Sequence, residues 1–152
     1  MLVGIAADHQ GYELKEKIVE ALRLKQLNVI DYGAQILNPN DDYPDFAIPL
    51  ARAISNKEIN HGIAICGSGI GASIACNKVR GVRAGLVHDE LSVREGVEDD
   101  NMNIICISAQ LVSLSLALEL VQCFLVSHFS EEPRHKRRLA KIAELEEMEL
   151  QK

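Results

Sequence analysis

Residues 61–79 read HGIAICGSGIGASIACNKV, and this stretch decides the class of fold. Its first part is a continuous apolar run, which is typical of a buried strand. A glycine-rich turn then separates this run from a second apolar segment with helical spacing. A strand, a turn and a helix in this order form one β-α unit. The stretch therefore predicts a parallel sheet with helices packed against it.

The same β-α unit recurs along the chain. We expect strands at residues 2–7, 28–33, 61–67, 82–89 and 102–109. Between and after them we expect helices at 12–25, 45–58, 71–79, a more polar segment at 90–101, and 114–127. This order predicts an α/β fold in which a five-stranded parallel sheet is covered by helices on both faces.

Composition and charge exclude several classes of protein. A chain of 152 residues suits a single domain over 1–152, and 47% hydrophobic residues is normal for a folded protein. The net charge of -6 argues against a general affinity for nucleic acid or anionic membranes. The first residues have no basic region, and no apolar stretch reaches spanning length, so we expect a cytoplasmic protein.

The four cysteines form neither a C-x-x-C pair nor a set with histidine at metal-ligand spacing. We therefore expect no disulfide framework and no metal site. Cys76, Cys106 and Cys123 lie in apolar surroundings and are interpreted as small core residues.

Polar residues that follow strands carry the chemistry, because ligands of parallel sheets bind at the carboxyl ends of the strands. Asp8 and His9 follow the first strand, Cys66 to Gly71 follow the third, and His88 and Asp89 follow the fourth. These are the candidate site residues. Helix capping by Asp8 and an exposed loop position for His9 are the alternative interpretations.

The glycine-rich turn presents free amides at the start of a helix and is suited to negative charge, either a phosphate or a developing oxyanion. Gly67, Gly69 and Ala72 match the dinucleotide fingerprint, with Asp89 at the position of the ribose-binding acid. The motif follows the third strand rather than the first, and the chain leaves no room for a substrate domain. A dinucleotide-binding module is therefore the weaker alternative.

Cys66 favours the second interpretation, in which the turn stabilises an oxyanion that develops during a reaction. A thiol at a strand end beside a helix N-terminus is suited to act as a base or nucleophile. Ser68 adds a hydroxyl among the amides. A base beside an oxyanion hole suits proton abstraction next to a carbonyl, with an enediolate as intermediate.

The last segment has an unusual charge order. Basic residues crowd 134–138 and acidic residues crowd 144–149, the reverse of what the helix dipole favours. We expect a helix over about 133–150. Arg134 and Arg138 are four residues apart and so lie on one face, where they are suited to bind a phosphate. A solvated charged helix is the alternative.

Several motifs together resemble one family, the type B ribose-5-phosphate isomerases with the related galactose-6-phosphate isomerase subunits. The resemblance covers nearly the whole chain. It rests on AADHQGYELK (6–15), DYPDFA (42–47), ICGSGIGASIACNKVRGVRA (65–84), DDNMN (99–103) and PRHKRR (133–138).

The resemblance implies a three-layer α/β/α Rossmann-like subunit that needs neither metal nor organic cofactor. It implies a homodimer or dimer of dimers with shared active sites, in which the last helix packs on a partner subunit and supplies Arg134 and Arg138 to the phosphate. It makes Cys66 the catalytic base. Asp8, His9 and Tyr43 would contact the sugar phosphate; for Tyr43, packing against the start of its helix is the alternative. The enediolate would be stabilised by Ser68 with the turn residues Gly67, Gly69, Ile70 and Gly71.

Two positions depart from the family pattern. Where the family has a histidine that opens the sugar ring, this chain has Asp99, followed by Asp100 as a candidate substrate contact. A carboxylate is a poor acid at neutral pH unless its pKa is raised. His88, at the end of the fourth strand, is a candidate replacement. Gln110 stands where the family often has another phosphate-contacting arginine.

The sequence therefore predicts a cofactor-free aldose–ketose isomerase that interconverts ribose 5-phosphate and ribulose 5-phosphate. An isomerase for a six-carbon sugar phosphate of the allose or galactose 6-phosphate type stays open, because pocket depth decides it. A sugar-phosphate-binding protein without catalysis is the alternative from another class.

Overall fold

The computed structural model describes residues 1–150 and has the expected alternation of strands and helices. The strands are β1 (Leu2–Ala7), β2 (Asn28–Asp31), β3 (His61–Cys66), β4 (Ala84–Leu86) and β5 (Ile104–Ser108). The helices are α1 (Tyr12–Leu24), α2 (Pro44–Ser55), α3 (Ile70–Cys76), α4 (Glu90–Asp100), α5 (Leu114–Val126) and α6 (Pro133–Leu150). The predicted α/β class is confirmed.

The five strands are parallel and lie in the order β2-β1-β3-β5-β4. The chain leaves β1 for β2 and then returns past β1 to β3, so the strand order reverses between β1 and β3. Ligands of open α/β sheets bind outside the carboxyl ends of the strands at such a reversal. The topology therefore selects the ends of β1 and β3 as the place to look for a site.

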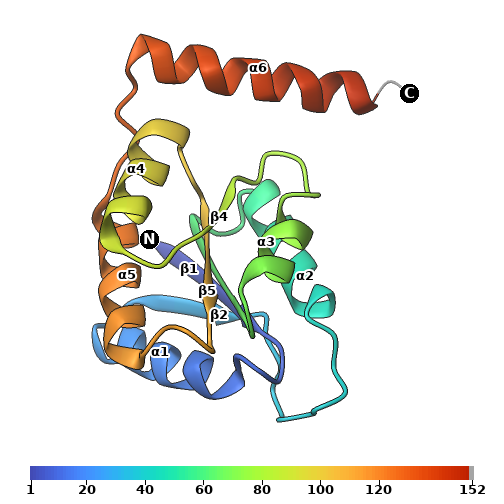
Figure 1. The fold of residues 1–152 in the computed structure, drawn as a ribbon, viewed down its shortest axis with the longest axis vertical. Helices are drawn as coiled ribbons and strands as arrows, with labels where there is room; N and C mark the ends of the chain where they lie inside the picture. The colour runs from blue at the N-terminus through green and yellow to red at the C-terminus, as the bar shows by residue number, and fades with distance from the viewer. Residues whose placement is uncertain (151–152) are drawn as a thin grey trace.

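Each face of the sheet has its own apolar core, because successive side chains of a strand point to opposite faces. Helices α1, α4 and α5 cover one face, and α2 and α3 cover the other (Figure 1). Isoleucine and valine dominate the strand side of the first core. The second core contains many alanines together with Cys66, Cys76 and Cys106. Cys66 thus belongs to the α2–α3 side of the sheet.

Most elements differ from their predicted bounds by one to three residues, and two need comment. The fourth strand covers 84–86 instead of 82–89, because β4 is an edge strand that pairs with β5 alone. The polar segment at 90–101 forms a regular helix, α4, because Val93 and Val97 are one turn apart and both are buried in the first core. The Asp89 carboxylate caps this helix by accepting the N–H of Ser92 at 2.8 Å.

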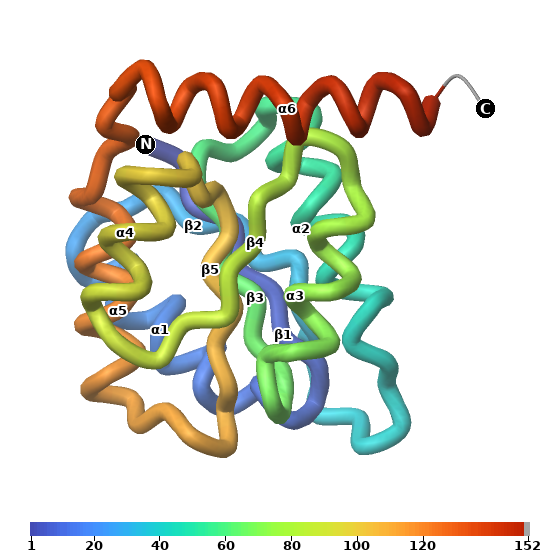
Figure 2. Tube along the Cα trace, turned by 45° about the horizontal axis from the view of Figure 1, so that its top comes forward, coloured from blue at the N-terminus to red at the C-terminus, as the bar shows by residue number. Residues whose placement is uncertain are grey.

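Helix α6 crosses the amino ends of the strands and runs the width of the molecule (Figure 2). Two contacts fix its start: the Ser130 N–H donates to the Glu98 carbonyl at 3.0 Å, and buried His135 holds the Ser130 hydroxyl through Nδ1 at 2.7 Å. Near its other end the Glu146 carboxylate accepts the N–H of Gly81 at 3.1 Å. The contact of Glu146 gives this part of the acidic end of α6 a structural role.

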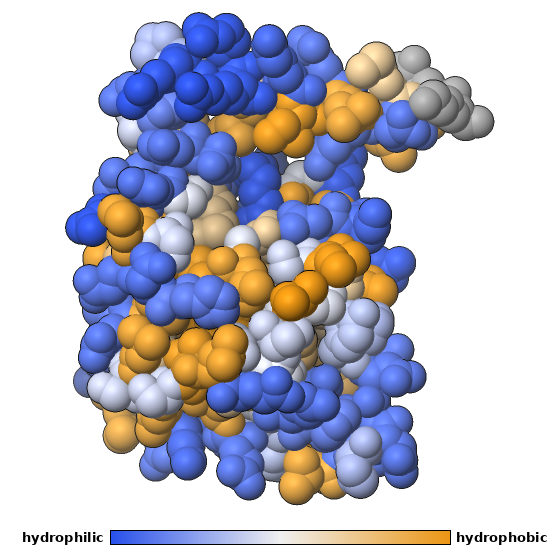
Figure 3. Space-filling view, viewed as in Figure 1, coloured by the Kyte–Doolittle hydropathy of each residue, from blue (hydrophilic) through white to orange (hydrophobic). Residues whose placement is uncertain are grey.

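The underside of α6 is apolar and only partly covered (Figure 3). Leu139, Ile142 and Leu145 line a cavity of about 530 Å³ between α6 and the body of the protein. Ile142 and Leu145 remain 48% and 54% exposed. Among residues 1–150, the helices are all too short or too polar to cross a membrane.

Candidate active site

The glycine-rich turn after β3 wraps around the Cys66 sulfur. The Gly69 N–H donates to Cys66 Sγ at 3.1 Å, and the Ile70 N–H donates to the Ser68 hydroxyl at 3.2 Å. Gly69 has a φ of 77°, in the left-handed region that glycine tolerates best. The turn therefore directs an amide at the sulfur, and an N–H in this position interacts more favourably with a thiolate than with a thiol.

Cys66 borders a cavity of about 310 Å³ at the carboxyl ends of β1 and β3. Gly71 lets the Tyr43 ring lie against the start of α3, since a Cβ at position 71 would come within 2.7 Å of that ring. The cavity is lined by Asp8, Gln10, Tyr43, Cys66, Gly67, Ser68, Ile70, Gly71 and Ile74. Seven of the predicted site residues, half of the set, are thus brought together at the strand-order reversal.

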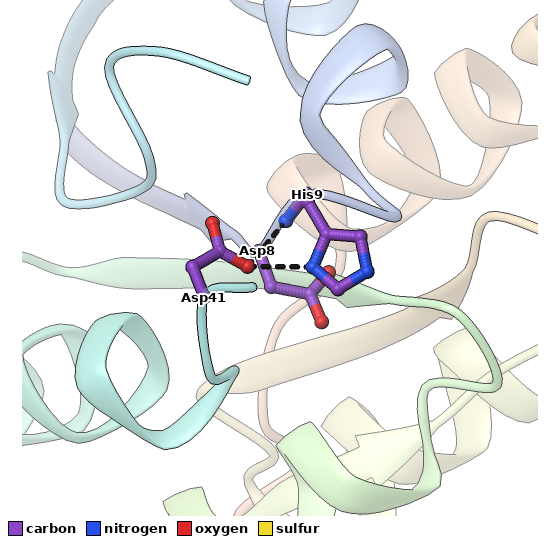
Figure 4. A group of neighbouring side chains, drawn as sticks. All are labelled: Asp8, His9 and Asp41. Carbon is purple, nitrogen blue, oxygen red and sulfur yellow. Dashed lines mark hydrogen bonds and ion pairs between the residues drawn. The ribbon is translucent and has the colours of Figure 1, made fainter. Parts of the chain in front are cut away.

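His9 stands in the chain between Asp8 and Gln10, which both line this cavity. Its side chain is held by Asp41 (Figure 4). Asp41 Oδ1 accepts the backbone N–H of His9 at 2.9 Å and lies 2.6 Å from His9 Nδ1. The hydrogen bond to Asp41 raises the pKa of His9 above its ordinary value, against a smaller opposing effect of burial, and the charge of Asp8 acts in the same direction as Asp41.

Asp8, His9 and Asp41 are also the group of side chains that comes nearest to a metal site in residues 1–150, with one donor atom of each within 4.8 Å of the others. Metal bonds to nitrogen and oxygen are about 2.0–2.2 Å long, so two ligands of one ion are normally further apart than 2.6 Å. The contact between His9 Nδ1 and Asp41 Oδ1 fits a shared proton.

Five of the predicted site residues lie away from this cavity. His88 follows β4, and β5 separates β4 from β3. Asp99 and Asp100 end α4 at the opposite side of the sheet, where the strands begin, which is called the amino edge here. There Asp99 Oδ1 is 3.4 Å from Nε2 of buried His135. Arg134 and Arg138 lie on α6 at the same edge. One chain therefore carries two separate groups of predicted site residues, at opposite ends of its strands.

Sequence reasoning missed Gln10, Ile74 and Asp41. Gln10 directly follows Asp8 and His9, so the rule that selected those two residues applies to it as well. Its Oε1 accepts a hydrogen bond from Gln110 Nε2 at 3.2 Å, which places Gln110 at the same end of the sheet. Asp41 gave no signal, because its contact with His9 depends on the path of the loop that leads into α2.

The other cysteines lie outside the lining of the cavity. All four are free, Cys76 and Cys106 are buried as predicted, and Cys123 is only half-buried. A hydrogen bond with Cys76, together with burial, raises the pKa of Cys106 well above its ordinary value. Cys106 therefore stays a neutral thiol, and Cys66 is the cysteine with access to the cavity.

Comparison with known proteins identifies the family. The model of the ribose/galactose isomerase family matches residues 3–142. The chain belongs to the ribose/galactose isomerase family. A curated member of this family from Mycoplasma genitalium, named "Probable ribose-5-phosphate isomerase B", is 43% identical over 145 residues, which are 95% of each chain.

Solved structures of family members have the same fold. The ribose-5-phosphate isomerase B of Clostridium thermocellum is 40% identical, with a TM-score of 0.93 over 97% of this chain and 99% of that one. The Mycoplasma genitalium enzyme with bound ribulose-5-phosphate is 41% identical, with a TM-score of 0.90 over 96% of each chain. The predicted family and the three-layer Rossmann-like fold are confirmed.

Proposed function

We propose that this protein is an aldose–ketose isomerase that interconverts ribose 5-phosphate and ribulose 5-phosphate in the cytoplasm, without a metal or organic cofactor. Family membership and the names of its relatives support the substrate. The observation that carries the chemistry is the Cys66 sulfur, which borders the cavity and accepts the Gly69 N–H.

The reaction moves one proton between neighbouring carbons. In the open-chain aldehyde, the Cys66 thiolate takes the proton from C2, and the electron pair of the C–H bond moves through C1 to the carbonyl oxygen. The N–H groups of the turn and the Ser68 hydroxyl stabilise this enediolate oxygen. The proton on O2 passes to O1, the C2 carbonyl forms, and the electron pair of the C1–C2 double bond takes back the proton from Cys66 at C1. This sequence conserves protons and electrons.

The second group of predicted residues belongs, in this proposal, to a neighbouring subunit. Arg134 and Arg138 lie at the amino edge of the sheet, whereas Cys66 lies at the carboxyl edge. A second copy of the chain would bring its basic helix start to the cavity of the first, and its phosphate-binding charge with it. The exposed apolar underside of α6 supports such an assembly, either a dimer or a dimer of dimers.

The direct test is conversion of ribose 5-phosphate in EDTA by the purified protein and by its Cys66→Ala variant. We expect turnover by the unchanged protein and a loss of at least about a hundredfold in the variant, because general acid–base catalysis contributes that much. Cys123→Ala, which removes a half-buried thiol outside the cavity, is the matched control and should keep its turnover.

Binding of ribose 5-phosphate without turnover by the unchanged protein would contradict the proposal. Six-carbon sugar phosphates would then be tested in the same assay, because Gln110 in place of an arginine alters the charge near the cavity. Activity on those sugars alone would indicate a six-carbon isomerase. Binding without turnover of any sugar would indicate a sugar-phosphate-binding protein.

A further inference from the structure

The proposed reaction begins with a step for which Cys66 is not suited. Ribose 5-phosphate in water is mostly a closed ring, and isomerisation needs the open aldehyde. Opening breaks the bond between C1 and the ring oxygen O4, adds a proton to O4 and removes one from the C1 hydroxyl. The step needs an acid and a base beside the ring, and the inference below rests on the proposed isomerase function.

Asp99, at the position of the family's ring-opening histidine, is poorly suited to supply the acid. It is a carboxylate, and it lies 3.4 Å from Nε2 of His135, a residue that is 1% exposed. Asp99 therefore already faces a buried partner within its own chain. In a shared site Asp99 would approach the neighbouring cavity together with Arg134 and Arg138, but a carboxylate is a better proton acceptor than donor at neutral pH. The acid therefore has to come from another residue.

The five histidines of the chain differ in their distance from the cavity. His61 begins β3 and packs edge-on against Phe124, with ring centroids 5.0 Å apart. His128 and His135 come after α5, towards the amino edge. His88 follows β4, beyond β5. His9 alone among the five has both of its chain neighbours in the lining of the cavity, Asp8 and Gln10.

Asp41 fixes the orientation of His9. A single oxygen, Oδ1, accepts the backbone N–H of His9 and bonds ring atom Nδ1, so backbone and ring are both held (Figure 4). Since Nδ1 is engaged by Asp41, Nε2 is the ring nitrogen left to exchange a proton with a ligand. An imidazole held through Nδ1 by a carboxylate is the arrangement of an acid–base histidine.

The environment of Asp41 strengthens its effect on His9. The Asp41 side chain is only 9% exposed, and its second oxygen, Oδ2, is buried without a hydrogen-bond partner in residues 1–150. No other donor competes there for the negative charge of Asp41, so His9 is its main partner. Asp8 is the second carboxylate near the ring, and both carboxylates favour the imidazolium form. His9 thereby stays a proton donor to higher pH than an ordinary histidine.

Asp8 is placed to act as the matching base. Its Oδ1 accepts the N–H of Gln10 at 3.0 Å and of Gly11 at 3.2 Å, which fixes the carboxylate at the end of β1. It lines the cavity, and one of its oxygens lies within 4.8 Å of a His9 ring nitrogen. A base in the cavity wall and an acid directly beside it in the chain thus stand next to each other.

We infer that His9, positioned by Asp41, opens the sugar ring by giving its Nε2 proton to O4, while Asp8 takes the proton of the C1 hydroxyl. The C1–O4 bond breaks, C1 becomes an aldehyde, and O4 becomes a hydroxyl. Asp8 is left protonated and His9 neutral, and transfer of that proton from Asp8 to His9 restores both groups. Asp41 is a positioning residue and does not touch the sugar.

The two directions of the reaction separate ring opening from isomerisation. Ribose 5-phosphate must be opened, whereas ribulose 5-phosphate cannot close a ring through its phosphorylated fifth oxygen and is always open. An enzyme without a ring-opening acid can use only the aldehyde that forms spontaneously. Its forward rate therefore stops rising with enzyme concentration at the rate of spontaneous opening, while its reverse rate keeps rising in proportion.

The experiment measures both initial rates over a wide range of enzyme concentration for the unchanged protein, His9→Asn, Asp41→Asn and Asp45→Asn. Asparagine at position 9 keeps a donor for Asp41 but has no Nε2. We expect a forward plateau and a proportional reverse rate for His9→Asn. For Asp41→Asn we expect a forward rate about tenfold lower, a smaller loss than the hundredfold or more that removal of the acid itself costs. Asp45→Asn removes an exposed carboxylate near Asp41 and should behave like the unchanged protein.

The pH profile gives a readout that a merely structural role of Asp41 would not move. Loss of the Asp41 charge lowers the pKa of His9, so the alkaline limb of the forward rate should shift to lower pH in Asp41→Asn. A proportional forward rate in His9→Asn, an equal loss in both directions, or an unshifted alkaline limb would each overturn the inference. No turnover by the unchanged protein in either direction would instead overturn the proposed function.

Discussion

One residue, Gly69, decides whether the Cys66 turn can form. Its φ of 77° lies in the left-handed region, and a Cβ there would come within 2.5 Å of Leu86 Cδ1 and 3.1 Å of the Ile107 backbone. Gly81 has nearly the same φ, 76°, but a Cβ on it would meet no atom within 4 Å. An alanine at position 81 would therefore cause backbone strain alone, whereas an alanine at position 69 would cause both backbone strain and steric clash.

We expect Gly81→Ala to lower the free energy of unfolding by about 1 kcal/mol, the cost of a left-handed alanine. Gly69→Ala should cost about 1–3 kcal/mol more, because the contact with the Ile107 backbone cannot be relieved by a rotamer change. It should also lower turnover, since the amide of residue 69 contacts the Cys66 sulfur. Urea unfolding and the isomerase assay on both variants check this, and equal losses of stability would contradict it.

Among the elements, β3 and α5 meet at a histidine that makes their packing sensitive to pH. The His61 ring packs on Phe124 of α5 at an angle of 85°, and its Nδ1 is buried without a hydrogen-bond partner in residues 1–150. Burial lowers the pKa of His61, and the positive charges of His128 and the N-terminus lower it further. The folded protein therefore holds this ring in its neutral form.

A lowered pKa in the folded state fixes the direction of the pH effect. The stability from neutral His61 is complete above about pH 6.5, the ordinary pKa of histidine, and is lost as the pH falls through the lower folded value. We expect the free energy of unfolding to drop less between pH 7 and pH 5 in His61→Phe, which keeps an aromatic ring against Phe124. Urea unfolding at both pH values checks this; an equal drop in both proteins would show that other groups dominate.

The sequence predicted most elements because apolar periodicity and turn residues agree within each of them. The strand order was not predictable in the same way. The runs that become β4 and β5 are both apolar, and nothing local specifies that β5 inserts between β3 and β4. The site residues divide in the same way into locally predictable ones and others. The positions of Asp8 and Cys66 at strand ends are visible in the sequence, whereas the contact of Asp41 with His9 depends on the course of a loop.

On the scale of the whole molecule, the two groups of predicted site residues lie at opposite edges of one sheet. If each active site combines the carboxyl edge of one chain with the amino edge of another, two different inactive chains can repair each other. Cys66→Ala damages the first group, and the double variant Arg134→Ala and Arg138→Ala damages the second.

Mixing the two inactive proteins after unfolding and refolding them together should restore activity. Random pairing in a symmetric dimer makes half of the dimers mixed, and each mixed dimer has one of its two sites intact, so we expect about a quarter of the full activity. The same proteins mixed without unfolding should recover it only as subunits exchange. No recovery after joint refolding would show that the arginines act within their own chain.

If active sites are shared between two chains, the position of α6 at the far edge from Cys66 has a genetic consequence. A chain damaged at both edges would spoil its own cavity and also the cavity that it should complete in a normal partner. In a cell that makes both forms in equal amounts, only pairs of two normal chains would work. Such an allele would leave about a quarter of the normal activity in a dimer, whereas an allele that makes no protein would leave about half.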